Sequence, residues 1–139
     1  MERKEMIQEF VDRFMENKDA LRAKFEADFP GEYKDIVKAV VEIITSKEYT
    51  AHDIDPKRIH EIDDGDYQGT LVYVIAEKGY QPSDYYYVKV SYGSCSGCDT
   101  LQHIESEHYF ATDKKESIDD LMTLALHIVQ GLKKMGEEE

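Results

Sequence analysis

The stretch YYYVKVSY at residues 85–92 decides the fold class, because it alternates as a strand with one buried face does. Val88 and Val90 mark the face that holds the core, so Tyr85 and Tyr87 are expected on the opposite face. Aromatic surface of this kind is typical of interfaces between proteins. Tyrosine is also a good strand former, so a purely structural role for these residues stays open.

The residues before this strand predict a hairpin. Asp64-Gly65 favours a tight two-residue turn, because both residues tolerate a positive φ. The turn would join a strand near residues 59–62 to one near residues 67–76. Together with residues 85–92, these strands predict a three-stranded antiparallel meander.

A helical pattern precedes the strands. Apolar residues recur at helical spacing from Ile7 to Phe25, up to the break at Pro30-Gly31. Residues near 2–28 are therefore expected to be helical, either as one helix or as two helices divided at Asn17.

Two further helices supply apolar faces for the sheet. One is predicted over residues 33–44, and a long C-terminal helix is predicted to begin at a capping box formed by Ser117 and Asp120. A small sheet needs one face covered, and the stripes around Ile36 and Leu121 are available to cover it. The sequence thus predicts an α+β fold, with the meander flanked by N-terminal helices and a long C-terminal helix.

Length and charge limit the function. A chain of 139 residues without a linker or repeat is expected to form one domain over residues 1–139. Its net charge of −13, from 30 acids and 17 bases, repels phosphates and argues against direct binding of nucleic acid. The same charge leaves open a DNA mimic that binds a basic protein.

The amino terminus and the hydropathy pattern indicate where in the cell the chain is expected. Acids lie within the first residues, and no apolar run approaches the roughly 20 residues that a membrane span requires. We therefore expect a cytoplasmic chain without membrane contact, in which thiols are kept reduced.

The turn SYGSCSGCDTLQ at residues 91–102 concentrates residues that could carry chemistry. Asp99 is expected to be the N-cap of a short helix, with Gln102 completing a capping-box pattern. Cys95 and Cys98 would then lie directly before that helix. In the simplest interpretation, the thiols only pack beneath an unusual backbone path.

Two chemical interpretations compete with packing. Cys95, Cys98, His103 and His108 have the spacing of a zinc knuckle, which would make zinc the cofactor. A continuous helix would place the two histidines about 140° apart, so ligation of one ion requires the helix to break between them. In the redox interpretation, the two cysteines form a thioredoxin-like pair, but the chain offers no βαβ unit. Metal analysis of protein purified without added zinc distinguishes these interpretations.

Two segments resemble known sequences. EIDDGDYQGT at residues 61–70 and SYGSCSGCDTLQ at residues 91–102 are similar to segments of uncharacterised proteins from tailed phages and prophages. That group has no assigned activity, so the resemblance implies an origin and no function.

No enzyme class follows from the sequence. It has no Ser/His/Asp order, phosphate loop or dinucleotide fingerprint, and the acids at 63, 64 and 66 lack the EF-hand spacing. We expect a small acidic interaction domain that binds a protein partner or a second copy of itself. The expected binding residues are Tyr85, Tyr87, Tyr92 and Asp99, and the alternative is the zinc or thiol site at the cysteine turn.

Overall fold

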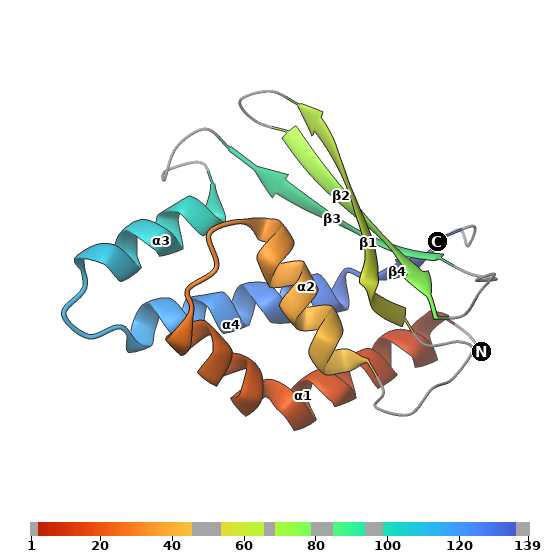
Figure 1. Cartoon of the computed structure of the whole chain (residues 1–139), viewed down its shortest axis with the longest axis horizontal. Helices are drawn as coiled ribbons and strands as arrows, with labels where there is room; N and C mark the ends of the chain where they lie inside the picture. Colours follow the sequence, from red (N-terminus) through yellow and green to blue (C-terminus); the bar gives the residue numbers. More distant parts are fainter. Residues whose placement is uncertain (1–2, 46–53, 66–68, 79–84, 94–98, 136–139) are drawn as a thin grey trace.

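The computed structural model describes residues 3–45, 54–65, 69–78, 85–93 and 99–135. The described elements are, in chain order, α1 (Arg3–Ala27), α2 (Tyr33–Ile44), β1 (Ile54–Gly65), β2 (Gly69–Glu77), β3 (Tyr85–Tyr92), α3 (Thr100–Phe110), α4 (Lys115–Gln130) and β4 (Lys133–Lys134). The fold is α+β, with an antiparallel four-stranded sheet in the order β1-β2-β3-β4 (Figure 1).

The sheet has one strand more than predicted. Directly after α4, Lys133 pairs with Tyr87 and Lys134 pairs with Tyr86, so β4 extends the sheet beyond β3. A two-residue strand of lysines has no alternating pattern for sequence analysis to detect. Its position follows from α4, which delivers the chain to the edge of β3.

The predicted turn at Asp64-Gly65 is wrong. Asp64 pairs with Thr70, and Gly65 pairs with Gly69, so both residues belong to the ladder between β1 and β2. The connection runs through residues 66–68, which lie outside the described residues. Longer hairpin connections also favour Asp and Gly near the turn, so this composition alone does not fix the register.

The N-terminal helix is a single element, which settles an alternative that the sequence left open. Asn17 lies inside α1, where its side-chain Nδ2 donates to the carbonyl of Arg13 at 2.8 Å and to that of Ile43 at 3.3 Å. The second bond links α1 to α2, because Ile43 lies in α2. Asn17 therefore joins two helices and does not break one.

The cap position of the last helix lies three residues earlier than predicted, and Ser117 does not cap the helix. The cap position is occupied by Lys114, whose side chain makes no capping hydrogen bond. Asp113 Oδ1 accepts a bond from the backbone N–H of Lys115 at 3.0 Å, while the hydroxyl of Ser117 is buried and donates to the carbonyl of Lys114 at 2.9 Å. The predicted capping box between Ser117 and Asp120 is therefore not formed.

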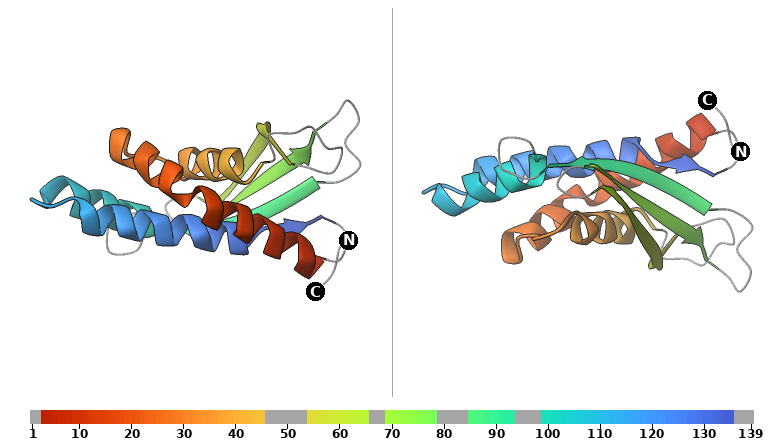
Figure 2. Two further views of the ribbon diagram at one scale, coloured as in Figure 1. Left: turned by 90° about the horizontal axis from the view of Figure 1, so that it is seen from below. Right: turned by 90° about the horizontal axis from the view of Figure 1, so that it is seen from above.

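The helices cover one face of the sheet. Helices α2 and α4 contact β1 and β3 respectively, and α1 packs against both helices. In the view from above in Figure 2, the strands lie in front of the helices, so the opposite face of the sheet is turned away from them. None of the described helices is long and apolar enough to cross a membrane. The main buried side chains of the core are Phe14, Leu21, Phe25, Ile36, Val40, Tyr73, Ile75, Tyr86, Val88, Leu121, Ala125 and Ile128.

Candidate functional site

A groove of about 300 Å³ opens where the strands meet the start of α2 and α3, and we call it the acidic groove. Every charged residue described in its lining is a carboxylate. These carboxylates belong to Glu32, Glu61, Asp63, Asp99 and Glu105. Carboxylates that share one concave surface give it a negative potential that attracts cations.

Strand alternation brings part of this lining together. Glu61 and Asp63 are two positions apart in β1, so their side chains lie on the same side of the sheet. In the ladder, Glu61 is opposite Tyr73 and Asp63 is opposite Leu71. The register between β1 and β2 therefore places a tyrosine directly against the first of the two carboxylates.

Each of three tyrosines donates a hydrogen bond to a groove carboxylate. Tyr73 Oη lies 2.7 Å from Glu61 Oε2, and Tyr92 Oη lies 2.6 Å from Asp63 Oδ1. The third pair joins Tyr33 Oη to Asp99 Oδ1 at 2.8 Å. An ionised carboxylate has about four lone-pair sites, so one phenol leaves acceptor capacity for a ligand at the more open carboxylates.

Burial moves the pKa of two of these phenols further above neutral pH. It raises the pKa of Tyr33 to about 12, and the neighbouring Asp99 adds to the rise. Burial also raises the pKa of Tyr73, and the hydrogen bond to Glu61 raises it further. Both phenols therefore remain donors at neutral pH, and the negative charge of the groove resides on the carboxylates.

Asp99 forms the inner wall of the groove. It is 5% exposed and accepts hydrogen bonds from the backbone N–H of Gln102 at 3.0 Å and of Gly93 at 2.8 Å, besides the bond from Tyr33. The backbone N–H of Leu101 donates to the Tyr33 hydroxyl at 3.0 Å. One buried carboxylate thus links the end of β3, the start of α3 and the start of α2.

The predicted N-cap role of Asp99 is confirmed, since its side chain accepts from the N–H of Gln102. The side chain of Gln102 does not complete the predicted capping box. Its Nε2 instead donates to the carbonyl of Gly93 at 3.0 Å, which adds a second link between α3 and β3.

Cys95 and Cys98 lie at residues 94–98, outside the described residues, so the zinc and redox hypotheses stay predictions. Helix α3 runs without a break through both His103 and His108. His103 is exposed, whereas the Nδ1 of His108 lies 2.7 Å from Ser117 Oγ. Among the residues described, no group of three or more His, Cys, Asp or Glu side chains is arranged to hold a metal ion.

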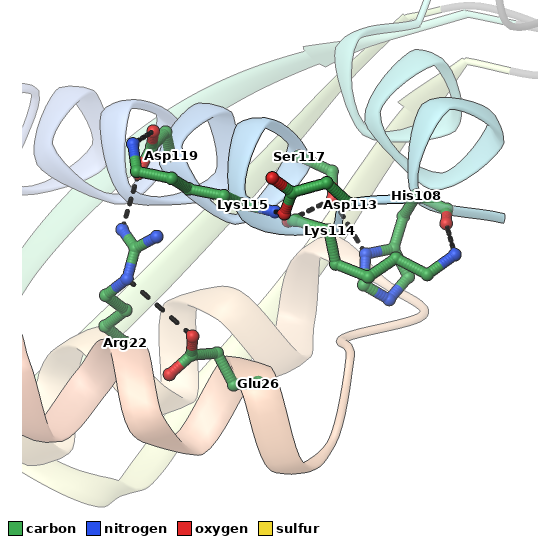
Figure 3. A network of polar contacts seen from close by, with 8 residues as sticks. All are labelled: Arg22, Glu26, His108, Asp113, Lys114, Lys115, Ser117 and Asp119. Atoms are coloured by element: carbon green, nitrogen blue, oxygen red, sulfur yellow. Dashed lines mark hydrogen bonds and ion pairs between the residues drawn. The ribbon is translucent and has the colours of Figure 1, made fainter. Parts of the chain in front are cut away.

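His108 of α3 contacts both α4 and the connection between α1 and α2. Its ring stacks on Phe29 with 4.2 Å between centroids, and its Nδ1 faces Ser117 of α4. Figure 3 shows Lys114 reaching back to the carbonyl of His108, beside the ion pair of 2.6 Å between Arg22 and Asp119. Burial lowers the pKa of His108, and the nearby charge of Lys114 lowers it further.

This environment predicts a loss of stability in acid. Because the pKa of His108 is below its ordinary value of 6.5 in the folded protein, the unfolded chain binds the proton more readily. The free energy of unfolding should therefore fall as the pH is lowered through 6.5. We expect His108→Gln to flatten this dependence in urea denaturation at pH 7 and pH 5. His103→Gln, on the exposed side of the same helix, should not, and equal slopes in all three proteins would contradict the assignment.

The four expected binding residues are divided between two sides of the sheet. Tyr92 and Asp99 line the acidic groove. Tyr85 is 43% exposed and Tyr87 is half-buried on the opposite side, while Tyr86 and the two valines of β3 are buried. The alternation expected for residues 85–92 is thus present in β3, and it separates the two pairs.

Sequence analysis did not identify four residues of the groove as site residues: Tyr33, Glu61, Asp63 and Tyr73. Glu61 and Asp63 were visible only as acids near a turn. Glu61 and Asp63 are brought together with Tyr73 by the register between β1 and β2. Tyr33 is 66 positions along the chain from Asp99, to which it donates a hydrogen bond. Neither relationship can be derived from local spacing.

Comparison of the chain with protein-family models, with curated proteins and with solved structures found no match. The function of the acidic groove is therefore inferred from its own geometry.

Proposed function

We propose that this chain is an interaction domain that binds a basic side chain of a protein partner in the acidic groove. The observation that carries the proposal is the charge of the lining: every charged residue described there is a carboxylate. A lysine or arginine of a partner would complement this charge, and electrostatic complementarity gives an interface its specificity and speed of association.

The tyrosines make the groove suited to a cation attached to an apolar stem. Ring faces attract ammonium and guanidinium groups, and the stems of lysine and arginine pack on apolar surface. Leu71 and Leu101 supply apolar lining next to Tyr73 and Tyr92. The phenol bonds hold Glu61 and Asp63 in place before a ligand arrives, which lowers the entropy lost on binding.

The net charge of −13 supports the same proposal at longer range, because it steers basic molecules toward the protein. Such binding weakens as salt screens the charges, with a Debye length of about 8 Å at physiological ionic strength. A salt-sensitive affinity for basic segments is therefore expected.

The test compares binding of two fluorescein-labelled peptides, tetra-arginine and tetra-glutamate, by anisotropy. We expect tetra-arginine to bind the wild type, and the double variant Glu61→Gln/Asp63→Asn to weaken it by about tenfold. Both substitutions keep an oxygen that can accept the bonds from Tyr73 and Tyr92.

The matched control is Glu16→Gln/Asp19→Asn, which removes the same charge from exposed positions of α1. It should change the affinity less than twofold, as expected for distant, exposed charges. Equal weakening by both double variants would mean that only net charge matters, and the groove would lose its assigned role.

A further inference from the structure

The strand β1 lies at the edge of the sheet, since the strand order is β1-β2-β3-β4 (Figure 2). Residues 59–65 pair with β2 in unbroken register. Among the described residues, no backbone hydrogen bond joins residues 59–63 to any element other than β2. In an antiparallel edge strand, every second residue turns its N–H and C=O away from the sheet. This segment therefore presents backbone donors and acceptors to another extended chain.

Side chains on both sides of this segment are exposed. Glu61 and Asp63 point toward the acidic groove and are exposed. By strand alternation, His60 and Ile62 point to the opposite side, and they are exposed as well. An element lying along this edge would cover one of the two pairs. Within the described part of the chain, the edge is therefore open at residues 59–63, and we call this stretch the open edge.

The first part of β1 is protected against pairing with a further strand, whereas the open edge is not. The register with β2 is irregular before Ile59, and Pro56 lies in that part of the strand. Proline lacks a backbone donor and a bulge bends the strand, so both prevent a further strand from pairing there. Arg58 also lies there, and its Nε is 3.4 Å from Asp55 Oδ2. The open edge contains no proline and no break in register.

The charge beside the open edge selects what can pair with it. Glu61 and Asp63 are its charged side chains on the side of the acidic groove. Each accepts a hydrogen bond from a tyrosine, and within the described chain neither forms an ion pair with a basic side chain. Side chains directly opposite on neighbouring strands have Cβ atoms about 4.5–5.5 Å apart, so opposite charges there attract and like charges repel. Basic residues of an added strand would complement the two carboxylates.

From the open edge and its charge we infer that the partner of the acidic groove is an extended segment with a basic residue at every second position, which adds to the sheet as a strand beside β1. Its backbone would bond to the open edge, and its basic side chains would meet Glu61 and Asp63. The inference rests on the proposed function, since these are the side chains that the acidic groove binds. A second copy of β1 fits less well, because two-fold pairing centred on Ile62 would oppose Glu61 to Asp63 of the copy.

The test measures the binding of fluorescein-labelled peptides by anisotropy. The peptides have seven residues, the length of the regular segment 59–65. In one peptide threonine and arginine alternate, and in the other the same residues are rearranged so that the arginines are adjacent. Only the alternating peptide directs every arginine to one side of a strand. We therefore expect it to bind the wild type at least about tenfold more tightly than the rearranged peptide.

Methylation of the peptide backbone tests the strand pairing itself. The N–H groups of alternate residues in an extended chain point to opposite edges, so either the arginine amides or the threonine amides face β1. Methylation of the facing set removes the donors and should weaken binding at least about tenfold. Methylation of the other set is the matched control and should leave the affinity within about twofold.

Several results would overturn the inference. Equal affinity for the two arginine peptides, or equal effects of the two methylations, would exclude strand addition. Salt-sensitive binding of both peptides would then leave the acidic groove its proposed role, whereas failure of every arginine peptide to bind would remove both proposals. An alternating threonine–glutamate peptide that binds as tightly, or an unchanged affinity in Glu61→Gln/Asp63→Asn, would show that the carboxylates do not select the partner. A dimer in light scattering that the alternating peptide dissociates would assign the open edge to a second copy.

Discussion

Replacing Asp99 with alanine is expected to lower the free energy of unfolding by about 3 kcal/mol. Loss of an N-cap alone costs about 1 kcal/mol. The remainder comes from the buried N–H of Gly93 and the hydroxyl of Tyr33, which lose their acceptor, because a buried polar group without a partner costs about 1–3 kcal/mol. Urea denaturation followed by circular dichroism measures the change.

The matched control is Asp113→Ala, which also removes a carboxylate that accepts from a backbone N–H at the start of a helix. Asp113 is exposed and its bond joins residues of the same turn, so water can replace it, and we expect a loss of about 1 kcal/mol or less. Similar losses for the two variants would show that Asp99 acts only as a cap and does not link β3, α2 and α3.

Replacing Leu121 with alanine is expected to cost about 3–4 kcal/mol, since truncation of a fully buried leucine loses burial and leaves a cavity. Leu121 is 0% exposed in α4, the helix that packs against α1 and the sheet. The core around it comes from several elements, so no single neighbouring side chain can fill the space.

Leu124→Ala in the same helix removes the same atoms from a partly buried position at the margin of the core. Its cost should be clearly smaller, about 1–2 kcal/mol, because water and neighbouring side chains can occupy the vacated volume. Thermal and urea unfolding of both variants give the comparison. A larger loss for Leu124 than for Leu121 would contradict the placement of α4 on the core.

The sequence by itself determined the elements that carry a local signal. Residues 33–44 form α2, as their apolar spacing predicted, and residues 85–92 form β3 with the predicted sides. The N-cap at Asp99 also follows from neighbours three residues apart. In each case the deciding pattern lies within one helix, one strand or one cap, so the side-chain period and the capping chemistry suffice to predict the element.

Only the tertiary structure decided the remaining elements. The strand β4 exists because α4 brings two lysines to the edge of β3, and Asp64-Gly65 joins the ladder because the sheet fixes the register. Ser117 lies buried inside α4, where its hydroxyl is 2.7 Å from the Nδ1 of His108 in α3. Local propensity was compatible with other outcomes at each of these places, and packing selected one of them.

The sides of the sheet and the acidic groove show the same division. Alternation in the sequence separated Tyr85 and Tyr87 from the valines of β3 and identified the valine side as the core side, but it could not indicate which helices would cover that side. The acidic groove depends on ladder partners and on the bond between Tyr33 and Asp99, whose residues are 66 positions apart. Contacts over such separations follow from how the helices pack on the sheet, because no local pattern specifies which distant groups will meet.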